Sequence, residues 1–285
     1  MKDGEIAARL RAWGLHPSKS LGQNFLTDPV ILERIVAAAG LTAADTVLEV
    51  GAGLGTLTTR LARRAGRVIA VELDDRLIPA LEDELADYPN VTLVVGDILT
   101  LDLAQLVGPG ACYDVVANLP YYITSAMLRR FLEAAPRPRR MVLTVQREVA
   151  ERILARSGRM SLLAVSVQFY ARPRWLFRIK PGSFYPSPQV ESAVIRLDVY
   201  DTPPITVDDE QLFFRVVRAG FAQPRKQLRN TLSAGLHLSA RDVAARLEAT
   251  GISPRRRAET LSLAEWGRVV EALASLISSA SLSST

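Results

Sequence analysis

The residues best suited to do chemistry are Asn118-Leu119-Pro120-Tyr121, which follow the apolar run Asp114 to Ala117. That run predicts a buried strand, so the Asn118 amide, the nearby backbone carbonyls and the Tyr121 ring would gather where the strand ends. Pro120 disfavours helix at Leu119 and lacks an N–H, which frees the preceding carbonyls to accept hydrogen bonds. Acceptors beside an aromatic face suit a planar ligand with an exocyclic amino group, such as adenine. The alternative is an ordinary strand-to-helix turn with its tyrosines in the core.

A glycine-rich turn lies further upstream. Thr46 to Val50 predicts a buried strand that runs into Gly51-Ala52-Gly53-Leu54-Gly55, and a helix is expected from about Thr56 to Arg64. Strand, glycine turn and helix form the layout of a nucleotide-binding half, in which glycine lets a ligand approach the backbone closely. The spacing is not the G-x-G-x-x-G of dinucleotide enzymes, and a tight turn without a ligand remains the alternative.

Two acidic residues follow the next two predicted strands. Glu72 ends the strand Arg67 to Glu72, where a carboxylate can accept both ribose hydroxyls of a nucleoside. Asp97 follows the strand Val91 to Val95. Together with Asn118 they put one polar group at the end of each of three successive strands, which predicts a nucleoside pocket at that edge of the sheet. The alternative for Glu72 is a helix cap.

The remaining elements must hold these groups in place. Asp28-Pro29 is a typical helix start, a capping residue followed by proline in the first turn, and Gly40 is a typical helix end. Other strands are expected at residues 139–146, 172–179 and 190–200, and other helices at residues 4–13 and 123–134. Residues 147–155 and 160–170 are expected to be helical or mixed.

A proline-rich loop, Pro181 to Pro188, precedes the last predicted strand. Because proline restricts the backbone, the loop is stiff and could present Phe184 toward the same crevice. The alternative is that Phe184 plugs the core beneath the loop.

The C-terminal third is helical in pattern. After the linker Asp201 to Pro204, helices are expected at residues 208–219, 224–236, 239–250 and 262–277. We therefore predict an α/β domain over residues 1–200, a small all-helical domain over 205–277, and a frayed serine-rich tail over 278–285.

Composition bounds the class of protein. The 285 residues are 48% hydrophobic and 23% charged, which is typical of a globular chain. Cys112 is the only cysteine, and His16 and His237 are the only histidines, so we expect no disulfide, no metal site and no Ser-His-Asp triad. There is no apolar run of 18 residues, and the N-terminus is charged where a signal peptide is apolar, so we expect a cytoplasmic protein.

Charge is unevenly distributed, although the net charge is only +5. Residues 41–125 carry 5 arginines against 12 acidic residues, residues 125–180 carry 13 basic against 3 acidic, and residues 211–260 carry 10 basic against 3 acidic. An acidic core between basic segments favours a nucleic acid partner. Solvated helix faces are the alternative.

Together these motifs resemble the rRNA adenine dimethyltransferases, in particular the bacterial small-subunit enzymes of the KsgA/RsmA family. The resemblance covers residues 18–235 and rests on Gln23-Asn24-Phe25-Leu26, Glu49 to Thr58, Glu72, Gly96-Asp97, Asn118 to Tyr121 and Pro181 to Ser192.

The resemblance implies a Rossmann-like class I methyltransferase domain with a seven-stranded, mostly parallel sheet, and S-adenosylmethionine as the methyl donor. The implied substrate is a pair of adjacent adenosines near the 3′ end of 16S rRNA, each methylated twice. We further expect a monomeric enzyme that acts on this rRNA within the 30S subunit or its precursor.

The resemblance also implies site residues. The cofactor would contact Gln23, Asn24, Leu26, Gly51, Gly53, Glu72, Asp97, Ile98 and Asn118. Asn118 and the Leu119 carbonyl, in the turn stiffened by Pro120, would accept hydrogen bonds from the target amino group, while Tyr121 and Phe184 would stack the base. From the basic segments, we assign RNA contacts to Arg140, Arg147, Arg225, Lys226 and Arg229.

Three other functions are compatible with parts of this pattern. A 23S rRNA adenine methyltransferase of the resistance type would share the pocket, but Arg225 to Asn230 resembles the small-subunit enzymes better. The glycine spacing counts against a nicotinamide-dependent oxidoreductase. Intact Glu72, Asp97, Asn118 and Tyr121 count against a purely non-catalytic RNA-binding factor.

Overall fold

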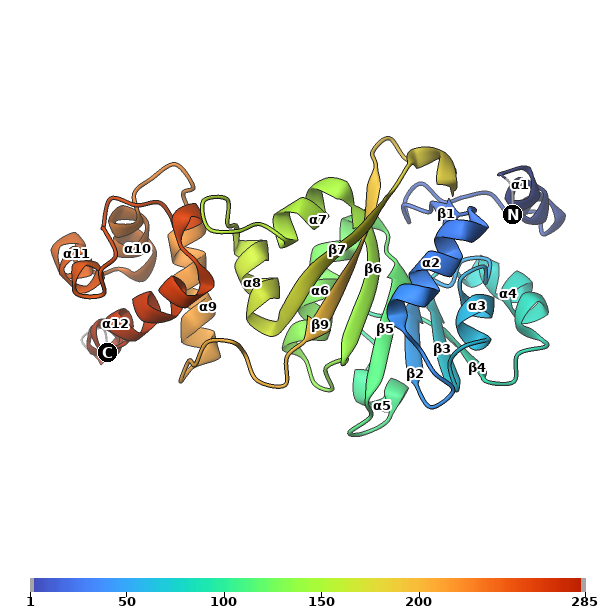
Figure 1. Cartoon of the computed structure of the whole chain (residues 1–285), viewed down its shortest axis with the longest axis horizontal. Helices are drawn as coiled ribbons and strands as arrows, with labels where there is room; N and C mark the ends of the chain where they lie inside the picture. The colour runs from blue at the N-terminus through green and yellow to red at the C-terminus, as the bar shows by residue number, and fades with distance from the viewer. Residues whose placement is uncertain (1–2, 283–285) are drawn as a thin grey trace. The chain divides into compact units, whose positions relative to one another are not determined.

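The structure is a computed structural model that describes the backbone of residues 3–282 and the side chains of residues 6–279. The chain forms two compact units (Figure 1). The first comprises Met1–Ala150 and Arg172–Val199, and the second comprises Glu151–Ala171 and Tyr200–Thr285. The predicted domains differ from these units because Glu151–Ala171 belongs with the C-terminal helices.

A seven-stranded sheet forms the centre of the first unit, in the order β4-β3-β2-β5-β6-β9-β7. The strands β2, β3, β4, β5 and β6 pair in parallel, and β9 pairs antiparallel to β6. Their bounds are β2 Thr46–Val50, β3 Arg67–Glu72, β4 Val91–Val95, β5 Tyr113–Asn118, β6 Arg140–Gln146, β7 Ala171–Ile179 and β9 Ser192–Val199. The strand order reverses direction between β2 and β5, which is where open α/β sheets bind ligands.

Helices flank this sheet. They are α1 Asp3–Ala12, α2 Pro29–Ala39, α3 Thr58–Ala62, α4 Ile78–Leu85, α5 Leu103–Val107, α6 Thr124–Glu133 and α7 Arg147–Ile153, with short 3-10 turns η1 Asp75–Leu77, η2 Tyr121–Ile123 and η3 Pro181–Ser183. The last three residues of α7 are counted with the second unit. The Rossmann-like α/β fold with a seven-stranded, mostly parallel sheet, predicted for the N-terminal part, is confirmed.

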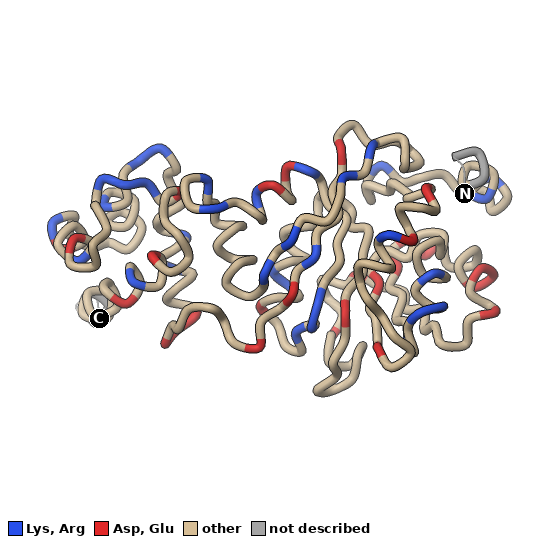
Figure 2. Tube along the Cα trace, in the orientation of Figure 1, with Lys and Arg blue, Asp and Glu red and all other residues tan. Residues whose placement is uncertain are grey.

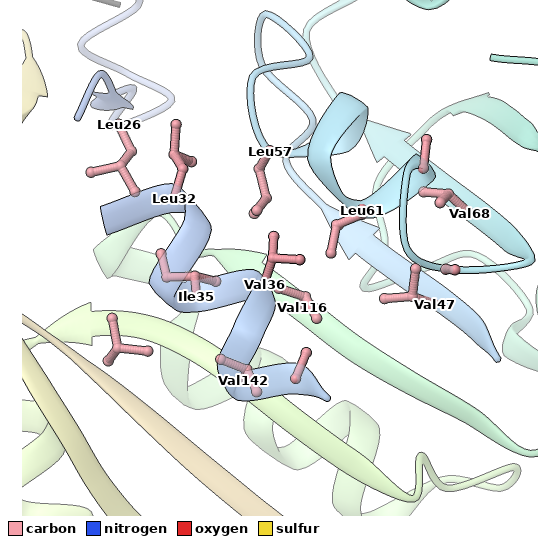
Figure 3. Packing of buried hydrophobic residues seen from close by; sticks show 14 of the residues in the cluster. Leu26, Leu32, Ile35, Val36, Val47, Leu57, Leu61, Val68, Val116 and Val142 are labelled. Atoms are coloured by element: carbon pink, nitrogen blue, oxygen red, sulfur yellow. The ribbon is translucent and has the colours of Figure 1, made fainter. Parts of the chain in front are cut away.

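Helix α2 shows how the sequence builds this core. Asp28 caps it by accepting from the Val30 and Ile31 N–H groups, and Gly40 ends it in the left-handed conformation. Its buried residues recur at helical spacing and face the sheet. Figure 3 shows this face of α2 packed toward Val116 of β5 and Val142 of β6.

A second, two-stranded sheet joins distant parts of the first unit. Strand β1 (Phe25–Leu26) pairs antiparallel with β8 (Phe184–Tyr185). The Thr27 N–H also donates to the Ser183 carbonyl at 2.9 Å. The N-terminal segment and the proline-rich loop are therefore fixed to each other.

The second unit is helical. Its elements are α8 Leu162–Tyr170, α9 Glu210–Phe221, α10 Leu228–Leu236, α11 Ala240–Ala249, the 3-10 turn η4 Ala258–Thr260 and α12 Leu263–Leu282. Segment 151–171 belongs here because Phe169 of α8 stacks on Phe213 of α9, with ring centroids 4.8 Å apart. Gly220 lies inside α9, where an added Cβ would come within 2.3 Å of the Trp266 ring.

Two expectations for this unit differ from the structure. Helix α10 begins at Leu228 rather than Pro224, because the Leu228 N–H donates to the Arg256 carbonyl at 2.7 Å and holds the helix start against another segment. The tail expected to fray from Ser278 is helical to Leu282, and its last residues, 283–285, lie outside the described residues.

Candidate active site

A pocket opens at the carboxyl ends of β2, β3 and β5 and at the turn after β4, in the first unit. Its volume is about 1040 Å³ with its open mouth included. All but one of the residues assigned to the cofactor or to catalysis line it: Gln23, Asn24, Leu26, Gly51, Gly53, Glu72, Asp97, Ile98, Asn118, Leu119, Pro120 and Tyr121. The sheet brings these residues together because parallel strands end at one edge.

The glycine turn after β2 is closed by the next strand. The Gly51 N–H donates to the Val71 carbonyl at 2.9 Å, and the Gly53 N–H donates to Glu72 Oε2 at 2.7 Å. Gly53 has φ +60°, and an added Cβ would come within 3.1 Å of the Phe25 ring. Glycine at this position therefore keeps the backbone exposed to the pocket.

Glu72 organises the same edge. Its Oε1 accepts from the Leu73 and Asp74 N–H groups, both at 2.9 Å. Burial raises the pKa of Glu72, and the hydrogen bonds from the backbone of Asp74, Gly53 and Leu73 oppose that shift. Oε2 accepts a single hydrogen bond from the described residues, which leaves it capacity for one ligand hydroxyl.

Glu49 lines the pocket as well, and the sequence reasoning gave it no role. It is 1% exposed, and its Oε2 has no hydrogen-bond partner among the described residues. Burial raises the pKa of Glu49 to about 8; the Thr58 hydroxyl opposes the shift and the charge of Glu72 adds to it. The signal that could have found it is an acid inside an apolar strand directly before the glycine turn.

The N-terminal segment is tied to the pocket by side chains. Gln23 Nε2 donates to Asp74 Oδ2 at 2.8 Å, while Gln23 Oε1 accepts from the Ser18 N–H at 2.7 Å. Asn24 Nδ2 donates to the Gly22 carbonyl at 3.1 Å. These contacts fix the segment at the rim of the pocket.

Asn118 has a defined orientation. Its Nδ2 donates to the Asn24 carbonyl at 3.0 Å, which leaves Oδ1 as the acceptor that can face a ligand. Within the described part of the chain, neither Asn118 Oδ1 nor the Leu119 carbonyl accepts a hydrogen bond. Two acceptors are therefore available at the end of β5.

Tyr121 lies on η2, directly after these acceptors. Its hydroxyl is 2.6 Å from Ser192 Oγ. Burial raises the pKa of Tyr121, and the hydrogen bond with Ser192 opposes that shift, so the hydroxyl keeps its proton at neutral pH. Tyr122, 59% exposed, also lines the pocket.

Phe184 is the one assigned pocket residue that the structure places elsewhere. It is 1% exposed and belongs to the hydrophobic core that contains Leu26 and Leu32. Pairing of β8 with β1 turns its side chain inward, so Phe184 plugs the core beneath the loop. The expectation that it faces the crevice is wrong in this structure.

The two basic residues assigned to RNA in the first unit differ in setting. Arg140 is half-buried: its Nη1 donates to the Ala39 carbonyl at the end of α2, and its Nε lies 3.6 Å from Asp198. This guanidinium therefore joins α2 to the sheet, which corrects its assignment as a free RNA contact. Arg147 is exposed and pairs with Glu191 at 2.9 Å.

In the second unit Arg225, Lys226 and Arg229 are exposed. Arg225 and Lys226 lie in the turn before α10, and Arg229 lies in its first turn, where its N–H donates to the Pro254 carbonyl at 3.2 Å. That bond brings the exposed Arg255 and Arg257 alongside, residues that the sequence reasoning did not assign. Figure 2 shows Lys and Arg on the α9–α10 and α11–α12 connections.

No helix among the described residues is long and apolar enough to cross a membrane. Over the same residues, no cluster of histidine, cysteine and acidic side chains could hold a metal ion.

The sheet order and the glycine turn beside acidic strand ends define a Rossmann-like class I methyltransferase. The family described as ribosomal RNA adenine dimethylase matches residues 15–275, and the chain belongs to this family. It is therefore an rRNA adenine dimethyltransferase, which uses a methyl donor of the S-adenosylmethionine type and acts on rRNA.

Individual relatives agree with this assignment. "Ribosomal RNA small subunit methyltransferase A" of Dehalococcoides mccartyi is 47% identical over 260 residues, which cover 91% of this chain and 89% of the relative. The crystal structure of the 23S rRNA methyltransferase ErmE has a TM-score of 0.70 and 30% identity and covers 88% of this chain and 100% of its own. A dimethyladenosine transferase from Plasmodium falciparum has a TM-score of 0.74, 24% identity and coverage of 88% and 98%, which supports the fold.

Proposed function

We propose that the chain transfers methyl groups from S-adenosylmethionine to the N6 amino groups of two adjacent adenosines near the 3′ end of 16S rRNA, giving N6,N6-dimethyladenosine. The observation that carries the proposal is the pair of acceptors, Asn118 Oδ1 and the Leu119 carbonyl, which take no hydrogen bond from the described residues and lie in the same pocket as Glu72 and Asp97.

The residues present fit S-adenosylmethionine. Its ammonium and sulfonium groups are cationic, and Glu49 offers a buried carboxyl oxygen without a partner in the described structure. Glu72 Oε2 can accept from a ribose hydroxyl, and Asp97 with the buried Ile98 lines the side expected for adenine. The Gly51–Gly53 backbone would lie against the methionine part. Bound there, the cofactor supplies an electrophilic methyl group.

The protein's own contribution is positioning. Adenine's amino nitrogen is a poor nucleophile because its lone pair is delocalised into the ring. Asn118 Oδ1 and the Leu119 carbonyl would each accept a hydrogen bond from one of its two N–H groups, from directions that are out of line. These bonds would hold the nitrogen nearer tetrahedral geometry, with its lone pair directed at the methyl group. Tyr121 would stack on the base, which must leave its helix to enter the pocket.

The second methylation places a further demand on the two acceptors. A monomethylated amino group donates one hydrogen bond, so one acceptor suffices to hold it. After dimethylation no donor remains, and the product loses its hydrogen bonds to the site.

Small-subunit rRNA is favoured because the relative with 47% identity over 91% of this chain is named for the small subunit. The second candidate is 23S rRNA, which the 30% identical structure of ErmE suggests. We infer further that the enzyme acts as a cytoplasmic monomer on the 30S subunit or its precursor. Light scattering of the purified chain tests the monomer, and a dimeric mass would contradict it.

The deciding experiment is mass spectrometry of nucleosides from unmethylated 30S and 50S subunits incubated separately with the protein and S-adenosylmethionine. Dimethyladenosine in the 30S sample alone is the expected result. Product in the 50S sample alone would move the substrate to 23S rRNA, and the absence of product in both would refute both substrates.

A further inference from the structure

The hydroxyl of Tyr121 and Oγ of Ser192 are 2.6 Å apart, although 71 residues separate them in the chain. Tyr121 belongs to the pocket, and its ring is half-buried. Ser192 is 0% exposed and does not line the pocket. The bond therefore joins a pocket residue to a side chain behind it.

Ser192 is a rigid anchor. It is the first residue of β9 and lies opposite Gln146 in the antiparallel pairing of β6 and β9. The Arg147 N–H donates to the carbonyl of the preceding residue, Glu191, at 2.9 Å, and the two side chains form an ion pair at 2.9 Å. The strand pairing and the Arg147–Glu191 contacts just beyond it thus hold Ser192 in place.

Tyr121 has less support of its own. It begins a 3-10 turn of three residues, none of which is buried, and the turn has no side-chain cap. Phe184, which could have packed beside the ring, lies in the core instead. A short turn fixes the Tyr121 backbone, but the direction of the ring depends on what holds its hydroxyl.

We propose that Ser192 is a positioning residue that sets the orientation of the Tyr121 ring toward the target base. This inference rests on the proposed function, because it assigns the ring to the substrate. It also gives the motif Pro181 to Ser192 a role through its last residue rather than through Phe184.

The key variant is Ser192→Ala. It leaves the Tyr121 hydroxyl without its partner, so the ring turns to find another, and the base loses its stacking surface. Loss of one such bond corresponds to about a tenfold drop in kcat/KM for RNA. The Kd for S-adenosylmethionine should stay the same, because Ser192 is absent from the pocket lining.

A second substitution tests the coupling. Tyr121→Phe removes the hydroxyl but keeps the ring, so it should cost about threefold. The double variant with Ser192→Ala should reach about one-third of the wild-type kcat/KM, compared with about one-tenth for Ser192→Ala alone. The reason is that it has no Tyr121 hydroxyl left without a partner. A purely structural role for Ser192 in β9 predicts no such rescue.

Thr231→Val is the matched control. Thr231 is 3% exposed, lies in the second unit, and donates its hydroxyl to the Leu228 carbonyl at 3.0 Å. This variant removes a buried hydroxyl of the same kind and should leave kcat/KM unchanged at equal folded fraction. Wild-type activity in Ser192→Ala, or a double variant no better than Ser192→Ala, would overturn the inference.

A readout independent of activity separates this inference from the proposed function. Tyrosine rings labelled with ¹³C give NMR signals, and Tyr121→Phe identifies the one of interest among seven. Ser192→Ala should shift or broaden that signal alone. If the wild type methylates neither subunit, the proposed function is refuted. The positioning role is refuted separately, by a Tyr121 signal that is the same in Ser192→Ala as in wild type.

Discussion

The pocket of the first unit and the basic surface of the second unit hold their functional groups in different ways. In the pocket Asn118, Glu72 and Gln23 each make at least one hydrogen bond that fixes the side chain. On the basic surface Arg225, Lys226 and Arg229 are exposed and form no ion pair with another described residue.

This difference predicts two kinds of energetics. Groups with fixed geometry in a sheltered site act through direction and distance, so a single change can remove most of the rate. Exposed cations act through screened charge, so their effects are small, shared among neighbours and sensitive to salt. The first unit should therefore govern chemistry, and the second should add RNA affinity.

The largest effect is expected at the pocket. Asn118→Ala removes one of the two acceptors, and we expect kcat to fall by roughly a thousandfold, in the range of a lost oxyanion-hole donor. Single-turnover methylation of 30S subunits measures this, with S-adenosylmethionine affinity determined by calorimetry. Asn230→Ala, an exposed asparagine of α10, is the control. A rate close to wild type in Asn118→Ala would remove the mechanism.

The next effect concerns the buried acid of the pocket. Because the pKa of Glu49 is raised to about 8, the folded state retains a proton that the unfolded state releases near pH 4.5. The stability contribution of the neutral carboxyl is thus complete below pH 4.5 and is lost as the pH rises through about 8. Between pH 6 and 8 the free energy of unfolding of the ligand-free protein should fall by about 2 kcal/mol.

Glu49→Gln should abolish that pH dependence in chemical denaturation experiments. Glu265→Gln is the matched control, because the Arg256 guanidinium lowers the pKa of Glu265 to about 2, and this carboxyl is ionised in both states across the window. If Glu49→Gln and wild type had parallel pH profiles, Glu49 would not be a buried neutral acid.

The basic surface should respond more weakly. Reversing Arg225, Lys226 and Arg229 to glutamate should weaken RNA binding about tenfold at physiological salt and reduce the slope of log K against log[salt] by about 2 to 3. The matched reversal of Arg63, Arg64 and Arg67, three exposed arginines of the first unit, is the control. If both triple variants had the same slope of log K against log[salt], the basic residues near α10 would not contact RNA.

The smallest effect is expected at Phe184, which the sequence assigned to the pocket and the structure places in the hydrophobic core. Phe184→Leu keeps an apolar side chain in the core, so it should cost about 1 kcal/mol of stability, with KM for RNA unchanged. Thermal unfolding and steady-state kinetics give the two numbers. A raised KM without loss of stability would return Phe184 to the site.

Residue spacing alone was sufficient to predict an α/β domain with a nucleoside pocket at the ends of its strands, whereas the methyltransferase class was predicted from the resemblance to a family. A strand that ends in Gly51, Glu72 or Asn118 puts that residue at the ligand edge whatever the packing details, because parallel strands share an edge. The bounds of most strands and of α2 followed from apolar runs and capping residues for the same local reason.

Tertiary structure decided the contacts between segments distant in sequence. Pairing of β1 with β8 turns Phe184 inward, and the Ala39 carbonyl at the end of α2 accepts a hydrogen bond from Arg140. Aromatic packing between Phe169 and Phe213 places Glu151–Ala171 with the helical unit. The bond between Tyr121 and Ser192 arose in the same way, as did the burial of Glu49 Oε2 without a hydrogen-bond partner in the described structure. Local sequence sets which elements form, whereas the direction of a side chain depends on the element that packs against it.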